Sequence, residues 1–153
     1  MYSRDLRIGE MSLNYFDVQH AIEIHDKIIN ESGGLHGIIN RGLIESVIEH
    51  LKNDSYYPEL EHKLTHLFFS VNKNHAFQDG NKRSAIALSA YFLEINNYGF
   101  KIERFISEME NIAVDVADNR INRDLLFDII MSLLTEEEYS EELKLKIISS
   151  LEF

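Results

Sequence analysis

The chain has 153 residues, which predicts one domain spanning residues 1–153, because a domain averages roughly 150 residues. Its 26 Asp and Glu residues exceed its 15 Lys and Arg residues, so the net charge is -11. This balance argues against binding to nucleic acid or to anionic membranes, which both attract positively charged surfaces. The chain has no cysteine, which excludes disulfides, thiolate metal sites and a cysteine nucleophile.

The first residues carry charges, at Arg4, Asp5 and Arg7, where a signal peptide needs an apolar stretch. The most apolar segment, residues 85–95, is too short to span a bilayer and contains Ser89 and Glu94. We therefore expect a cytoplasmic protein.

Apolar residues recur at helical spacing through most of the chain. The pattern predicts a first helix from Asp17 as N-cap up to Gly33, a second over about 41–53 and a third after Pro58. Residues 83–98 have no polar face, which predicts a buried helix at the centre of the bundle. Three more helices are expected at about 104–118, 123–134 and 136–151, the last with capping-box spacing over 135–138.

The predicted fold class is therefore all-α, a bundle of six to eight helices around a buried central helix. Four of the seven glycines fall between Gly33 and Gly42. Glycine-rich segments form turns, so residues 33–42 are interpreted either as a short β-hairpin or as a plain loop.

Residues 75–83, between the third helix and the central one, have the composition of an anion-binding site. Asp79-Gly80-Asn81 is typical of a turn and leads directly into a helix start. The first backbone N–H groups of a helix lack intrahelical acceptors, and the helix dipole adds partial positive charge, so phosphate binds well there. Lys82 and Arg83 add two cations that oppose the dipole unless an anion is bound.

His75 and Asp79 complete this arrangement. A histidine is suited to general-base catalysis on a hydroxyl, because it titrates near neutral pH. A single carboxylate beside bound phosphates is suited to Mg²⁺. Phe77 is expected to be buried and to fix the loop. The residues alone leave an alternative open, in which the segment is only a turn with solvated cations.

The segment also resembles the signature of the Fic/Doc (Fido) family, His-x-Phe-x-[Asp/Glu]-[Gly/Ala]-Asn-[Gly/Lys]-Arg. In this chain the signature reads His75-x-Phe77-x-Asp79-Gly80-Asn81-Lys82-Arg83. Outside the motif the chain is similar to the death-on-curing (Doc) branch over roughly residues 16–100. The matching positions there are His25-Asp26, Ser32-Gly33-Gly34-Leu35, Gly37, Gly42-Leu43-Ile44-Glu45-Ser46 and Asn74. The resemblance implies a single Fido domain.

Two positions indicate which group of ATP the protein would transfer. Fic proteins that transfer AMP usually have glycine at the position of Lys82 and a further arginine at the position of Ile86. Both departures match the Doc branch, which is described as a protein kinase. The lysine fills space on the anion loop, so the nucleotide is expected to bind in the opposite sense and to present its γ-phosphate.

The resemblance thus implies a Doc-like toxin of a type II toxin–antitoxin system, an ATP-dependent phosphotransferase that acts on a Ser or Thr hydroxyl of a target protein. In the Doc branch that target is a translation elongation factor. Transfer of AMP (AMPylation) by the same site is the alternative. A non-catalytic, nucleotide-sensing helical partner protein is a second alternative.

The resemblance also implies a role for each motif residue. His75 would accept the hydroxyl proton, and Asp79 would hold Mg²⁺. Arg83 would bind phosphate oxygens and offset charge in the transition state. The backbone of Gly80, Asn81 and Lys82 would bind the phosphates of ATP, and the Asn81 side chain would orient the loop.

The glycine-rich segment matches in position the family's flap, which holds the target backbone by strand addition. Its target-facing residues would be Leu35, His36, Ile38 and Ile39; a plain connecting loop remains the alternative.

Many Fic proteins also carry a self-inhibitory [Ser/Thr]-x-x-x-Glu-[Gly/Asn] helix. Here Glu110-Asn111 follows Ile106 in place of Ser or Thr, so we expect no built-in inhibition and a separate antitoxin.

His62 and His66 lie four residues apart on a predicted helix, a spacing that can bind a metal. The intervening residues lack the glutamate of a zinc protease helix. A surface histidine and a groove-lining histidine are the favoured interpretation.

Overall fold

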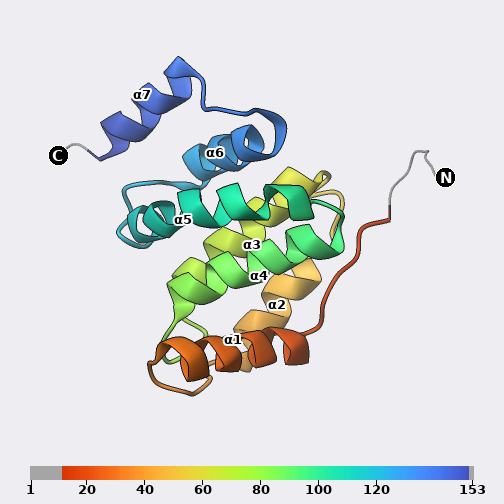
Figure 1. Ribbon diagram of the computed structural model, residues 1–153. Helices are drawn as coiled ribbons and strands as arrows, with labels where there is room; N and C mark the ends of the chain where they lie inside the picture. Colours follow the sequence, from red (N-terminus) through yellow and green to blue (C-terminus); the bar gives the residue numbers. More distant parts are fainter. Residues whose placement is uncertain (1–11, 152–153) are drawn as a thin grey trace.

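The computed structural model describes residues 12–151, and in this range the chain forms α-helices with one 3-10 turn and no β-strand (Figure 1). This confirms the all-α prediction. The elements are α1 (Val18–Ser32), α2 (Arg41–Leu51), α3 (Leu60–Asn74), α4 (Asn81–Ile95), η1 (Gly99–Lys101), α5 (Ile102–Ala117), α6 (Arg123–Thr135) and α7 (Glu141–Ser150).

Two helices share the centre of the bundle. As expected, α4 is central and packs against α1, α3 and α5. The helix α3 is equally enclosed, because it packs against α2, α4, α5 and α6. In Figure 1, α1 and α2 lie at one end of this pair and α6 and α7 at the other. The sequence pattern did not show the burial of α3, because this helix also buries polar side chains with internal partners. The Asn72 amide, for example, donates to the Ala113 carbonyl at 3.0 Å.

Several helix starts have a capping side chain, and the predicted Asp17 cap is one of them. Asp17 caps α1 by accepting the His20 N–H at 2.8 Å, and Asn40, Asn122 and Ser140 cap α2, α6 and α7 in the same way. Such a side chain satisfies one of the backbone N–H groups that a helix start leaves unpaired. The exception that bears on function is α4, whose N-cap is Gly80 and therefore has no capping side chain.

The predicted start of the last helix is wrong. Thr135 is the last residue of α6. The N–H of the following residue, Glu136, donates to the Ser132 carbonyl and makes the last hydrogen bond of that helix. The Glu136 carboxylate accepts from the Ser132 hydroxyl at 2.8 Å instead of capping a new helix. The α7 helix begins only at Glu141, after the Ser140 cap.

Residues 33–40 form an extended loop and not a hairpin. The loop lies along the motif segment, where Ile38 makes an isolated antiparallel bridge with Phe77. The Ile39 N–H donates to the Ala76 carbonyl at 2.7 Å, and the Gln78 N–H donates to the Gly37 carbonyl at 3.0 Å. These bonds tie the predicted flap to the motif.

The His62 and His66 rings are used in packing. The His62 ring lies against Phe127, with ring centroids 4.8 Å apart, and the His66 ring stacks on Tyr57 at 4.4 Å. Over residues 12–151, no three potential metal-ligating His, Cys, Asp or Glu side chains gather at one place. In the same range, no helix combines the length and the apolar character that crossing a bilayer would require.

His66 is a buried histidine whose surroundings favour the neutral form of its imidazole. It is 6% exposed, and its Nε2 has no hydrogen-bond partner among the described residues. Burial, followed by the nearby Arg123 cation and by His50, lowers the pKa of His66 from 6.5 to about 4. Between about pH 6.5 and pH 4, His66 is therefore protonated in the unfolded chain but neutral in the folded protein.

We predict that the free energy of unfolding falls as the pH is lowered from about 6.5 towards 4, because in this window the unfolded chain binds more protons than the folded one. Urea unfolding at a series of pH values measures this slope. His66→Gln should flatten it, whereas His20→Gln, at a partly exposed position on α1, should leave it unchanged. Equal slopes for the parent and His66→Gln would contradict the prediction.

Candidate active site

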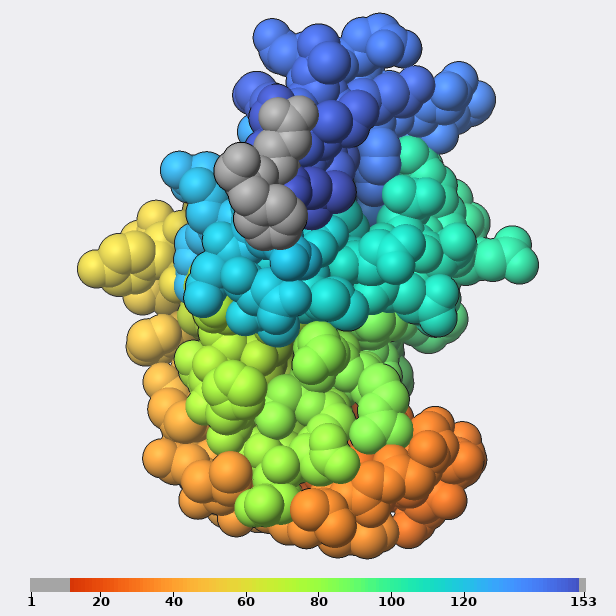
Figure 2. All heavy atoms as spheres, turned by 90° about the vertical axis from the view of Figure 1, so that its left-hand side faces the viewer, coloured from red at the N-terminus to blue at the C-terminus, as the bar shows by residue number. Residues whose placement is uncertain are grey.

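The motif residues 75–80 connect the end of α3 to the start of α4, and the 33–40 loop and α1 border them. Figure 2 shows this face, where the yellow-green surface around residue 80 lies beside the orange surface of α1 and of the loop. The surroundings of the motif thus include residues that lie about 45 positions earlier in the chain.

The first turn of α4 presents unpaired backbone donors. Among the described residues, no acceptor takes a hydrogen bond from the N–H groups of Asn81, Lys82 or Arg83. Gly80 adopts a positive φ of 76° at the N-cap, and a Cβ atom there would lie 3.1 Å from Ile29 Cδ1. Only glycine fits this backbone without strain. The helix end is therefore open to an anion.

Asn81 holds the loop through its side chain. Its Oδ1 accepts the Phe77 N–H at 3.2 Å, and its Nδ2 donates to the Phe77 carbonyl at 3.0 Å. Phe77 itself is 1% exposed, so the loop is fixed at the core. The structure therefore gives Asn81 the loop-orienting contacts that the motif implies, and it confirms that Phe77 is buried.

Asp79 is held as an anion at the open helix end. Its Oδ2 accepts the Leu35 N–H at 3.1 Å, and its Oδ1 accepts the Gly80 N–H at 2.8 Å. The Leu35 and Gly80 hydrogen bonds, in that order, and the Arg83 charge lower the pKa of Asp79 below its usual 3.8. An ionised carboxylate beside a phosphate-binding helix end fits Mg²⁺, which prefers one or two carboxylates with phosphate oxygens and water.

The two cations of the motif lie differently. Arg83 is half-buried, and its Nη1 donates to the Gly33 carbonyl at 2.9 Å, so its guanidinium lies over the glycine pair. Lys82 is exposed on the same helical turn. Both cations belong to the first turn of α4, the turn whose N–H groups are open.

His75 ends α3 in a left-handed conformation, with φ 51° and ψ 45°. A non-glycine residue in this region costs on the order of 1 kcal/mol, and such strain is often found at functional sites. The His75 side chain is exposed, and within residues 12–151 it makes no hydrogen bond, so its imidazole is accessible to a substrate hydroxyl.

The predicted flap residues divide into two groups. Leu35 and Ile39 are 62% and 61% exposed and Ile38 is 41% exposed, so all three offer apolar surface beside the motif. The His36 side chain is directed to α1 instead, where its Nε2 lies 2.9 Å from Asn30 Oδ1. Contact with a target remains a prediction for all four.

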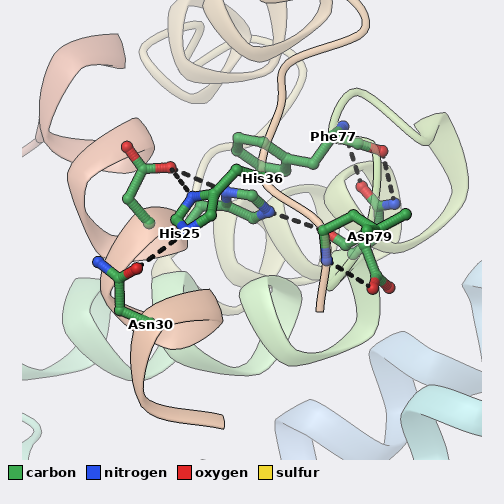
Figure 3. A network of polar contacts seen from close by, with 8 residues as sticks. His25, Asn30, His36, Phe77 and Asp79 are labelled. Atoms are coloured by element: carbon green, nitrogen blue, oxygen red, sulfur yellow. Dashed lines mark hydrogen bonds and ion pairs between the residues drawn. The ribbon is translucent and has the colours of Figure 1, made fainter. Parts of the chain in front are cut away.

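One residue near the motif was not predicted as part of the site. His25 of α1 is fully buried, and its Nε2 lies 2.7 Å from the Asp79 carbonyl oxygen (Figure 3). The His25 ring stacks on Phe77 with centroids 3.8 Å apart and planes 5° apart. The available signal was a histidine at a core position of the apolar stripe of α1.

A cavity of about 810 Å³ lies at the far ends of α3 and α4, lined in part by Tyr15, Lys63 and Tyr98. It is separated from the motif by the length of these helices. None of the residues that line this cavity belongs to the motif.

The family model of the Fic/DOC family matches residues 15–93, more than half of the chain, and the chain therefore belongs to this family. It is 27% identical over 131 residues to "Protein kinase doc" of Escherichia phage P1, which covers 82% of this chain and 100% of that protein. It is 30% identical over 96 residues to "Toxin Doc" of Mycolicibacterium smegmatis, which covers 60% of this chain and 74% of that protein. Both relatives confirm the Doc branch.

We predict that Gly34→Ala raises the pKa of Asp79. A Cβ atom at Gly34 would lie 2.7 Å from Asp79 Oδ2 and 3.1 Å from Arg83 Nη2, so the Asp79 carboxylate must shift away and lose its hydrogen bond from the Leu35 N–H. Loss of a hydrogen bond to the carboxylate favours its protonated form. Carboxyl ¹³C shifts followed against pH, without divalent metal, measure this change.

Gly33→Ala is the matched control. Gly33 also has a positive φ, of 88°, but a Cβ there meets nothing within 4 Å. It adds backbone strain without the clash, so its effect on the Asp79 pKa should be smaller. An equal rise in both variants would show that loop strain alone is responsible.

Proposed function

We propose that this protein is a Doc-like toxin that transfers the γ-phosphate of ATP to a Ser or Thr hydroxyl of a target protein. The observation that carries the proposal is the open N-terminus of α4, where three unpaired N–H groups lie beside Asp79 and Arg83. Positioning and charge stabilisation of this kind are most of what phosphoryl transfer requires from a protein.

In the proposed reaction the target hydroxyl oxygen forms a bond to the γ-phosphorus, and the bond from that phosphorus to the bridging oxygen breaks. ADP is the leaving group, and His75 accepts the hydroxyl proton. The N–H groups of α4 bind phosphate oxygens, and Arg83 offsets the charge that develops on them. Asp79 would hold Mg²⁺, which when bound neutralises phosphate charge.

The choice of phosphate over AMP rests on Lys82 and Ile86. Ile86 is half-buried and packs against the core, so this position offers no cation to a second set of phosphates. The relative from phage P1 is named a protein kinase, which supports the same choice. AMP transfer by the same site, and nucleotide sensing without catalysis, are the competing functions.

The proposed partners are proteins. The exposed Leu35, Ile38 and Ile39 beside the motif are suited to hold a target segment. The two Doc relatives support inhibition by a separate antitoxin. We place the protein in the cytoplasm, where a translation elongation factor is the first target to test.

Incubation with a cell lysate and ATP labelled separately at the α or the γ position distinguishes these functions. We expect protein labelling from the γ position only. Labelling from the α position alone would refute the kinase proposal and support AMP transfer. Binding of ATP without labelling from either position would support the sensor.

Substitution of His75 tests the proposed general base. Because general-base catalysis contributes roughly 10²–10⁴-fold, His75→Asn should lower the transfer rate by a factor in that range. Asparagine tolerates the left-handed backbone that His75 adopts, so the loss reports on the imidazole. His20→Asn, on the surface of α1, is the control. Toxicity to cells equal to that of the parent would show that His75 is not the base.

A further inference from the structure

The peptide bond between Asp79 and Gly80 is held from its carbonyl side by α1. His25 Nε2 lies 2.7 Å from the Asp79 carbonyl oxygen, and the His25 ring is completely buried. A carbonyl oxygen only accepts hydrogen bonds, so the ring nitrogen that faces it must carry the proton. His25 is therefore a donor through Nε2.

The orientation of the His25 ring is fixed on its other sides as well. Its face stacks on Phe77, and Asp26 Oδ1 lies 3.4 Å from its Nδ1. Figure 3 shows the ring directed from α1 towards Asp79, with Asn30 on the side away from Asp79. Ring packing and hydrogen bonding together leave His25 one position, with its donor on the Asp79 carbonyl.

The direction of this carbonyl determines the direction of the Gly80 N–H. In a planar trans peptide the C=O and N–H groups point in opposite directions. With the carbonyl directed to His25, the Gly80 N–H is directed to the opposite side of the peptide, where it donates to Asp79 Oδ1 at 2.8 Å. A flipped peptide would present the carbonyl oxygen to that side and repel a phosphate.

Glycine at position 80 makes the flip accessible, because glycine populates positive and negative φ with similar ease. The observed φ of 76° is therefore not enforced by Gly80 itself. The His25 hydrogen bond is a contact that distinguishes the two orientations.

We propose that His25 is a positioning residue that holds the Asp79–Gly80 peptide in its phosphate-binding orientation. The expected effect of His25 on nucleotide affinity rests on the proposed function above, whereas its effect on the orientation of the Asp79–Gly80 peptide does not. His25 touches neither nucleotide nor target, and it acts through the loop.

Three variants at this position separate the hydrogen bond from the packing. His25→Phe keeps an aromatic ring on Phe77 but removes the donor. His25→Gln places an amide nitrogen near the position of Nε2, and His25→Asn is one carbon shorter and does not reach the carbonyl. We expect ADP with Mg²⁺ to bind roughly tenfold more weakly to the Phe and Asn variants, as expected for one lost hydrogen bond, and within about threefold of the parent to the Gln variant. His20→Phe, on the same helix, should bind like the parent.

The orientation of the peptide is read directly from the Gly80 amide resonance. The chain has seven glycines, so selective ¹⁵N-glycine labelling gives a simple spectrum. Before any nucleotide is added, we expect the Gly80 resonance to shift or double in His25→Phe and His25→Asn and to keep its parent position in His25→Gln. An unchanged Gly80 resonance in both the Phe and Asn variants would overturn the proposal.

The two proposals fail in different ways. If the parent binds neither ADP nor ATP, the nucleotide-transfer function fails, and the Gly80 resonance still tests His25. If His25→Phe does not fold, as judged by circular dichroism, the Gln and Asn pair provides the comparison. In the parent itself, imidazole ¹⁵N shifts should show a proton on His25 Nε2, and an unprotonated Nε2 would overturn the proposal.

Discussion

Burial of Phe77 is the constraint on which the rest of the site depends. The ring is almost completely enclosed and stacks on His25, while the backbone of the same residue is held by the Asn81 amide on one side and by Ile38 on the other. An apolar side chain thus positions a polar loop. Because the loop is fixed at this point, the groups before and after it in the chain, His75 and the first turn of α4, are fixed in relation to each other.

The negative net charge of the chain does not exclude a small anionic ligand at this site. A net charge of -11 opposes long polyanions, but it does not oppose a single nucleotide at a helix end where Arg83 and Lys82 are concentrated. The charge on Asp79 is stabilised by two backbone N–H groups. An anionic ligand and an anionic side chain can therefore share one loop if a divalent cation lies between them.

Local features of the structure could be predicted from the sequence, whereas long-range ones could not. The Asp17 cap and the Gly33 stop depend on neighbouring residues, and both were foreseen. The burial of Phe77 was foreseen from its place in the motif, but the distant residues that contact it, His25 and Ile38, were not. The start of α7 was missed because the Glu136 side chain and carbonyl are taken by Ser132 and by the distant Arg104. The role of His25 was missed for the same reason, since its partner Asp79 lies 54 positions away.

The long sequence separations within the site have a consequence for how the site assembles during folding. Leu35 and Asp79 are 44 positions apart, and Gly33 and Arg83 are 50 apart. Contacts of such separation close large loops and form late in folding, after local helices. A chain in which α1 and the 33–40 loop have not yet docked onto α4 lacks the hydrogen bonds that shape the motif loop. The site is therefore assembled only when α1 and the 33–40 loop have packed against α4 and the motif.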